Sequence, residues 1–232
     1  MLQLAVLTFC TPLVFLVIIA ATARRFVYRG IAWVEIAQKP SLVLLAEFLA
    51  YVVVVLCMVA LVEGRSQRRF WDAIRWNWPK HTWRLLGLGV ALSISLQILG
   101  YFLPIPRNLP FERFFEHRMD AFLTSAFAIS FGPFVEELFF RGFLYPVLAR
   151  HMSVAGGVLL TALAFGMVHA LQLGFAWAAI LIIFLVGVAL TTVRAVTHSV
   201  GSSFLVHVAY NSTLTVLTFV GTDGFRHLDR LQ

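Results

Sequence analysis

Charged side chains are scarce in this sequence. Only 12% of its 232 residues are Asp, Glu, Lys or Arg, whereas 60% are hydrophobic. A soluble domain carries about twice that charged fraction. The apolar residues also lie in long runs, which is the arrangement that a bilayer requires. The composition excludes an ordinary soluble domain and predicts an integral, multi-pass membrane protein, in the cytoplasmic membrane if the source is prokaryotic.

Cysteine and a basic amino-terminal segment are also lacking. The two cysteines, Cys10 and Cys57, fall inside apolar runs, and no Cys-x-x-Cys pair occurs. This excludes a disulfide framework and a thiolate zinc site. Residues 21–23 resemble a cleavage site, but the apolar run before them is long and has no basic lead-in. We therefore expect an uncleaved first span.

Long apolar runs are what the sequence does contain. A run of roughly 20 apolar residues crosses the hydrocarbon core of a bilayer. The runs predict an all-α, polytopic transmembrane helical bundle of about seven spans, at residues 2–23, 42–62, 85–103, 121–148, 154–172, 176–193 and 200–221. Only a tight turn around Leu173-Gly174 separates the fifth and sixth spans, which predicts a helical hairpin.

The net charge of +7 comes almost entirely from arginine outside the apolar runs. These residues flank hydrophobic segments, which indicates contact with anionic lipid headgroups rather than nucleic acid. Residues 65–84 mix arginine and tryptophan, as expected at a headgroup interface. Phenylalanines and charges alternate at helical spacing over residues 111–122, which predicts an interfacial helix or a surface helix leading into the fourth span. Basic residues divide almost evenly between the two sides, so the orientation stays open.

Few ionisable residues fall well within the predicted spans. A charged side chain at the bilayer centre costs roughly 3 kcal/mol even on lenient insertion scales. Glu47 lies near the start of its span and can reach the interface. The others come from three spans, and a cavity-lining polar site is the economical explanation for them. They are Glu136, Glu137, Arg141, His169 and His207.

The fourth span holds three of these residues. Glu137 and Arg141 are four residues apart with the acid first, which is the favourable order for an ion pair on one helix face. Glu136 is rotated by about 100° from Glu137 and needs a partner of its own. Gly132-Pro133 removes a backbone donor, which predicts a kink or an opening of the helix there.

The fifth and seventh spans each carry a polar residue pair at i, i+4. Phe165 precedes His169, and His207 precedes Asn211. Histidine can donate or accept hydrogen bonds, and the asparagine amide can donate them. Taken singly, each such residue is compatible with a packing role between helices. Their conjunction predicts a functional site.

At these residues the sequence resembles the CPBP family (CAAX protease and bacteriocin-processing, or Abi) of intramembrane proteases, which includes the Ras-converting CAAX endopeptidases. The family pattern is Glu-Glu-x-x-x-Arg, Phe-x-x-x-His and His-x-x-x-Asn or Asp. Here these motifs are residues 136–141, 165–169 and 207–211, in the family's order. The resemblance covers residues 85–221 as a protease core. It leaves residues 1–84 as a two-span region with a basic interfacial connection, and 222–232 as a short polar tail.

The resemblance implies hydrolysis of peptide bonds in membrane-tethered substrates, either CAAX-like or of the bacteriocin and leader type. It makes Glu136 the general base, and His169 helps to hold and activate the attacking water. His207 and Asn211 are expected to donate to the oxyanion of the tetrahedral intermediate. These roles agree with the residue chemistry, because a carboxylate in an apolar setting is a stronger base and donors in a dry site stabilise developing charge well.

The resemblance gives Glu137, Arg141 and Phe165 structural or supporting roles. A zinc alternative stays open, because Glu136, His169 and His207 have the ligand types of a two-His, one-Glu catalytic site. The chain has no His-Glu-x-x-His, and the metal-free scheme uses both histidines and the asparagine. We therefore favour a glutamate mechanism without a cofactor.

Two other functions are compatible with these features. A non-proteolytic immunity or scaffold protein of the same family would retain its activity in a Glu136→Ala variant. A small transporter could use the Glu–His cluster as a proton relay, although repeated halves or paired broken helices are not visible in the sequence. A question of depth also remains. Glu136 falls near the middle of its span and His169 close to the end of its own, so either the fourth span begins late or the fifth ends below the membrane surface.

Overall fold

The computed structural model describes residues 2–66 and 68–231. The chain divides into two compact units, Met1–Ala73 and Ile74–Gln232, and each is described by itself. In the described residues all regular structure is helical, so the predicted all-α class is confirmed. The predicted division of the chain at residue 84 follows the family pattern and stays a prediction.

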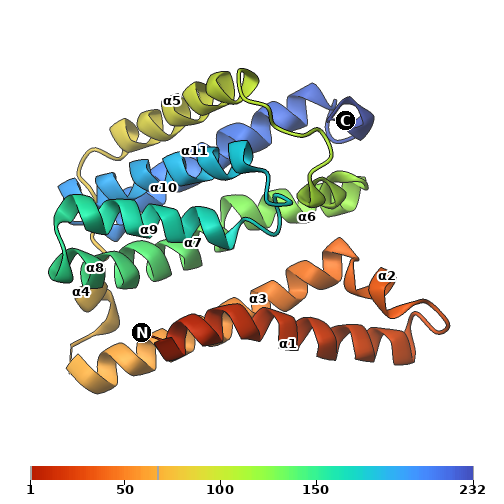
Figure 1. Cartoon of the computed structure of the whole chain (residues 1–232), viewed down its shortest axis with the longest axis horizontal. Coiled ribbons are helices and arrows are strands. Elements are labelled where there is room, and N and C mark those ends of the chain that lie inside the picture. The colour runs from red at the N-terminus through yellow and green to blue at the C-terminus, as the bar shows by residue number, and fades with distance from the viewer. Residues whose placement is uncertain (1, 67, 232) are drawn as a thin grey trace. The chain divides into compact units, whose positions relative to one another are not determined.

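The first unit is a pair of long helices. Helices α1 (Leu2–Phe26) and α3 (Pro40–Ser66) pack side by side and are joined by the short α2 (Trp33–Ala37) (Figure 1). Glu47 lies inside α3, and its carboxylate accepts a hydrogen bond from the Tyr51 hydroxyl one turn later, at 3.1 Å. This carboxylate therefore has a partner on its own helix.

The second unit contains the remaining predicted spans. The short α4 (Phe70–Ile74) lies at the boundary between the units. In the second unit the third span is α5, the fourth is divided among four segments, and the fifth to seventh are α9, α10 and α11. The bounds are α5 (Thr82–Tyr101), η1 (Pro110–Phe115), α6 (Arg118–Ile129), α7 (Phe131–Glu136), η2 (Glu137–Leu144), α8 (Tyr145–His151), α9 (Val154–Val168), α10 (Trp177–Thr197), α11 (Val200–Gly221) and η3 (Leu228–Leu231).

Small residues let these helices approach closely. Helix α5 packs along α11, and α9 packs along α10 as the predicted hairpin (Figure 1). A Cβ built on Gly187 of α10 would lie 2.9 Å from the Cα of Ala162 in α9. Such contacts drive helix association where no water is available to favour it. The turn of the hairpin contains Gly174 with φ +57°, a conformation that glycine adopts at little cost.

The fourth span is broken, as the sequence indicates, but at a different residue. Helix α6 ends at Ile129, and Ser130 has φ −128° and ψ −88° before α7 begins. The break precedes Gly132-Pro133 because a proline removes the N–H that would bond the carbonyl four residues earlier, here Ile129, and its ring crowds that carbonyl. The chain then continues as a π-helix, η2.

Helix α9 is short. Its 15 residues rise about 22 Å, against a hydrocarbon core of about 30 Å. Helix α9 ends at Val168, with His169 as its C-cap, which agrees with the alternative that the fifth span ends early. The α5–α6 connection packs on the turn that follows. Phe111 N–H donates to the Gln172 carbonyl at 3.0 Å, and Leu109 and Leu173 share a small apolar core.

The predicted helix over residues 111–122 is wrong as a single element. The chain forms the short 3-10 helix η1, and His117 is extended before α6 begins. Pro110 starts η1, and two phenylalanines of this region, Phe115 and Phe122, pack against the ring of Phe225 instead of lying along one helix face. Phe225, in the predicted polar tail, is 2% exposed and packs against Phe115, Phe122 and Phe219.

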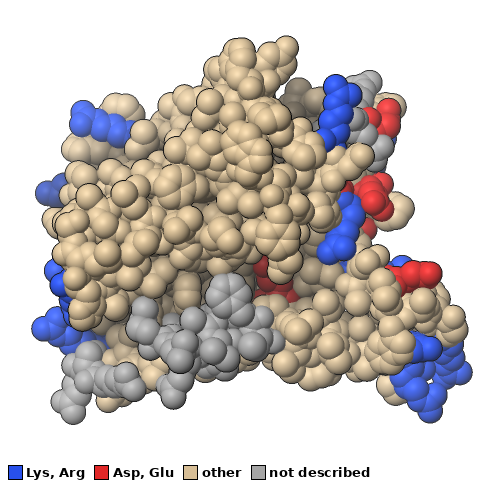
Figure 2. Space-filling view, in the orientation of Figure 1, with Lys and Arg blue, Asp and Glu red and all other residues tan. Residues whose placement is uncertain are grey.

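Among the residues that the structure describes, five helical segments are long and apolar enough to cross a membrane: 40–64, 82–101, 118–151, 177–197 and 200–221. In the upper part of the face that Figure 2 draws, which is the second unit, Lys and Arg side chains lie toward the two edges and the surface between them is mostly uncharged. Exposed Trp83 and Tyr101 stand near the two ends of α5, about 27 Å apart along its axis. Aromatic rings at this spacing are typical of the two membrane interfaces, which supports an integral membrane protein.

Candidate active site

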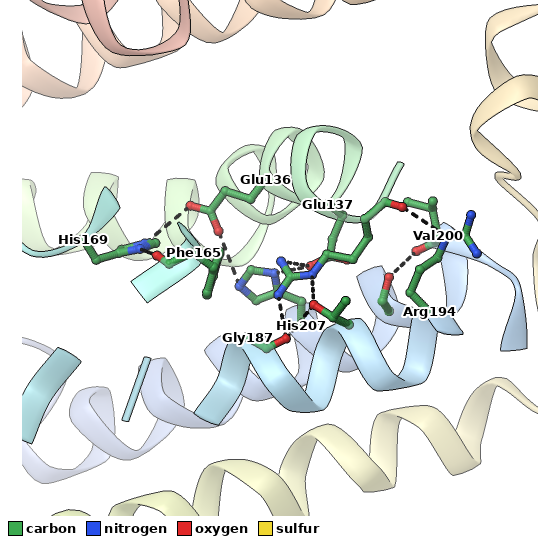
Figure 3. Close-up of polar contacts among 11 residues, drawn as sticks. Glu136, Glu137, Phe165, His169, Gly187, Arg194, Val200 and His207 are labelled. Carbon is green, nitrogen blue, oxygen red and sulfur yellow. Dashed lines mark hydrogen bonds and ion pairs between the residues drawn. The ribbon is translucent and has the colours of Figure 1, made fainter. Parts of the chain in front are cut away.

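Three side chains from three helices converge on one point. Glu136 is the last residue of α7, His169 caps α9 and His207 lies in α11. Glu136 Oε1 is 3.8 Å from His169 Nε2, and Glu136 Oε2 is 3.6 Å from His207 Nε2. Figure 3 shows the carboxylate pointing between the two imidazole rings. The structure therefore brings together the three residues that the sequence singled out from separate spans.

Each histidine is held by its other ring nitrogen. His169 Nδ1 is 2.7 Å from the Phe165 carbonyl, and His207 Nδ1 is 3.0 Å from Glu137 Oε1. A backbone carbonyl can only accept, so His169 Nδ1 carries the proton and donates it. An ionised Glu137 imposes the same arrangement on His207. Both rings therefore present Nε2 toward Glu136.

Exposure separates the two glutamates. The Glu136 side chain is 18% exposed and that of His169 is 21% exposed, whereas Glu137 and Arg141 are fully buried. Glu137 Oε1 accepts from Arg141 Nη1 at 2.9 Å, as the i, i+4 spacing predicts. The same oxygen contacts His207, and this contact could not be predicted from the sequence because it joins residues 70 apart. Glu137 therefore orients a histidine as well as pairing with Arg141.

Arg141 is enclosed by helix α10 and an aromatic ring. Its Nε donates to Thr191 Oγ1 and its Nη2 to the Gly187 carbonyl, both at 3.3 Å. Its guanidinium carbon lies 4.5 Å from the centre of the Phe165 ring. That ring also lies 4.9 Å from the imidazole centroid of His169 and 5.9 Å from that of His207. Phe165 thus contacts Arg141 of the buried ion pair and both histidines.

Asn211 is placed differently from the other motif residues. Its Nδ2 donates to the Ala128 carbonyl at 2.7 Å, in the last turn of α6. That carbonyl is one that a helix end leaves without a backbone donor. The contact ties α11 to the broken fourth span, next to Ser130. The second N–H of the amide is not used by this bond, so Asn211 can still donate to another acceptor.

The sequence reasoning missed Arg194. The predicted sixth span ended at residue 193, but α10 continues to Thr197, and Arg194 is 4% exposed. Its Nε donates to the backbone carbonyl of Arg141 at 3.2 Å. A span boundary drawn one turn later would have included this residue among the buried ionisable groups.

The possibility of a metal site was tested on the same residues. Glu136, His169 and His207 supply suitable ligand types. Among the residues that the structure describes, however, no group of three or more His, Cys, Asp or Glu side chains is placed to hold a metal ion. The zinc alternative therefore stays a prediction, and the proposed reaction is written without a metal.

Comparison with known proteins agrees with this geometry. Residues 118–213 match the family model described as type II CAAX prenyl endopeptidase Rce1-like. No curated protein and no solved structure matches the chain. The matched segment contains the broken fourth span, α9, α10 and most of α11, and therefore every residue of the converging site. Over this segment the chain is similar to the Rce1-like CAAX prenyl endopeptidases, which is consistent with the CPBP resemblance of its three motifs.

Proposed function

We propose that this protein is a multi-pass intramembrane endopeptidase in which Glu136 activates a water molecule for peptide-bond hydrolysis. The observation that carries the proposal is the convergence of Glu136 with the Nε2 atoms of His169 and His207. The family match supports the reaction class. The partial exposure of Glu136 and His169 supports access to this point from outside the bundle.

One water molecule suits this arrangement. Separations of 3.6 and 3.8 Å are too long for direct hydrogen bonds, but a water oxygen can lie about 2.8 Å from the carboxylate and from both Nε2 atoms. The proposed water donates to Glu136 and to His169 Nε2. This leaves an oxygen lone pair for attack, and the carboxylate is in position to take the proton.

The proposed reaction balances without a cofactor. The water oxygen bonds to the scissile carbonyl carbon while its proton passes to Glu136, and the carbonyl electrons move onto the oxygen. The oxyanion accepts from Nε2–H of doubly protonated His207, whose added charge Glu137 balances, and from the amide of Asn211. The C–N bond then breaks, and Glu136 returns the proton to the leaving amine.

The proposed substrate is a membrane-tethered peptide or protein, of CAAX-like or leader type. Its backbone must be extended at the scissile bond, because a helical carbonyl is already bonded within its own segment. The proposed surroundings are a bilayer with anionic headgroups, which the exposed basic and tryptophan residues of the α3–α5 connection would contact.

The deciding experiment compares variants in liposomes containing tethered test peptides, with products identified by mass spectrometry. In ¹⁸O-labelled water, we expect the wild type to place one labelled oxygen in the new carboxyl group. Glu136→Gln and His169→Ala should lose cleavage. Glu47→Gln is the matched control, since it neutralises a carboxylate that hydrogen-bonds within α3.

Three results would contradict the proposal. Equal cleavage by wild type and Glu136→Gln would show that this carboxylate is not the base. Loss of cleavage with a chelator and its recovery with zinc would replace the metal-free mechanism with a metal-assisted one. Full biological activity of Glu136→Ala, without any cleavage, would favour an immunity or scaffold protein.

A further inference from the structure

The π-helix η2 leaves one backbone carbonyl without a helical donor. In an α-helix the carbonyl of Arg141 would accept from Tyr145 N–H, but that N–H bonds to the Phe140 carbonyl instead. In a π-helix the donor would be residue 146, which is proline and has no N–H. Both regular donors of the Arg141 carbonyl are therefore removed, one by the π pattern and one by Pro146.

Arg194 supplies the missing donor from another helix. Its Nε donates to the Arg141 carbonyl at 3.2 Å, and both groups are buried. Figure 3 shows Arg194 beside the polar cluster, on the side of Glu137 away from His169. A buried carbonyl without a donor is costly, and so is a charged side chain inside a span. The bond satisfies the carbonyl and gives the guanidinium a partner at once.

We propose that Arg194 is a positioning residue of the site, which holds η2 in the π conformation through the Arg141 carbonyl. Its effect on catalysis rests on the proposed function. The segment that it holds begins directly after Glu136, and the side chain of Arg141 bonds to Glu137, which in turn orients His207. A change in the helical pattern of η2 would rotate Glu136 relative to Glu137 and Arg141.

The side chain of Arg194 makes a second contact just after η2. Arg194 also lies over the ring of Tyr145, 5.9 Å from its centroid, so it contacts the beginning of α8 directly after η2.

Two substitutions of equal length separate the hydrogen bond from the charge. In Arg194→Gln the amide nitrogen stands as many bonds from Cα as the arginine Nε, so the donor is kept and the charge is lost. In Arg194→Met a methyl group takes that place, so both are lost. We expect Arg194→Met to lower kcat about tenfold with little change in KM, and Arg194→Gln to stay within about threefold of the wild type.

A second comparison uses Pro146. Pro146→Ala restores an N–H that can bond the Arg141 carbonyl in the π pattern. In the Pro146→Ala background, Arg194→Met should lower kcat by less than about threefold, because the Arg141 carbonyl no longer needs the Arg194 side chain as its donor. Amide hydrogen exchange of residues 137–150, read by mass spectrometry in detergent, should rise about tenfold in Arg194→Met alone. This measurement needs no substrate, so it tests the hydrogen bond even if the protein cleaves none of the peptides.

Three outcomes would overturn the inference. Equal losses in the Gln and Met variants would assign the role to the charge. If the amide hydrogen exchange of residues 137–150 in Arg194→Met equals that of the wild type, η2 does not depend on the hydrogen bond between Arg194 and the Arg141 carbonyl. If Arg194→Met lowers kcat as much in the Pro146→Ala background as in the wild type, the need for Arg194 does not arise from the N–H that Pro146 lacks. If the single variant Arg194→Met does not fold, amide exchange is compared instead between Arg194→Gln and the double variant Arg194→Met, Pro146→Ala.

Discussion

His207 Nδ1 lies 3.0 Å from the Glu137 oxygen that also accepts from Arg141. One buried carboxylate oxygen therefore serves a structural ion pair and a histidine of the proposed active site. The arrangement makes the second glutamate of the Glu-Glu motif more than an anchor for its own helix. It also ties the position of His207 in α11 to a residue of the fourth span.

Replacing Glu137 should therefore affect stability and activity together. Glu137→Met leaves Arg141 buried without its acid, which we expect to cost about 3–5 kcal/mol of folding free energy. The double variant Glu137→Met, Arg141→Met should recover most of that loss, since both charges are then removed. It should still be inactive, because His207 has lost its acceptor. Thermal unfolding in detergent and peptide cleavage measure the two effects, and an active double variant would contradict the second.

Asn211 should show a separable double role. Its bond to the Ala128 carbonyl predicts a loss of about 1–2 kcal/mol in stability for Asn211→Ala. The proposed oxyanion contact predicts in addition a fall in kcat of about 10²-fold or more at constant KM. Thr213→Ala is a suitable control, because its hydroxyl bonds one turn back to Ala209 in the same helix. A loss of stability with unchanged kcat would remove Asn211 from the oxyanion site.

Gly187 should tolerate no side chain. A Cβ at this position would lie 2.9 Å from the Cα of Ala162 and 3.1 Å from its Cβ, so Gly187→Ala should cost about 1–3 kcal/mol through overpacking. Adding Ala162→Gly should recover part of this loss. Gly87→Ala in α5 is the control, because nothing lies within 4 Å of its Cβ position. Equal unfolding temperatures for the two alanine variants would contradict the close approach of α9 and α10.

The end of the chain should contribute to stability through Phe225. This side chain is buried among three other phenylalanine rings, and Phe225→Ala should cost about 3–4 kcal/mol. Phe102→Ala, which truncates a ring that is 75% exposed, should change little. Unfolding in increasing SDS compares the two. A neutral Phe225→Ala would mean that the aromatic cluster does not hold the start of α6.

Five of the seven predicted spans correspond to helices long and apolar enough to cross a membrane among the described residues, because hydrophobic runs report directly on bilayer thickness. The Glu137–Arg141 pair could be predicted because it depends only on helical spacing. The contact of Glu137 with His207 could not, since it depends on how two distant helices pack. The break at Ser130 was displaced from its predicted place because a proline disturbs the turn before it. Arg194 was missed because its helix extends one turn beyond the apolar run. Pro146 carried a signal that could have been used, since its missing N–H implies a carbonyl that needs another donor.

Because α9 ends early, the thickness of the surrounding bilayer should affect the geometry of the site. Its 15 residues rise about 9 Å less than the 21 residues of α10 beside it. Bilayers accommodate such a mismatch by thinning locally, and the cost grows with lipid chain length. His169 stands at the short end, so lipids with longer acyl chains work against the position that it takes beside Glu136. We therefore expect the rate of peptide cleavage to fall in liposomes of longer-chain lipids, because His169 is displaced from Glu136.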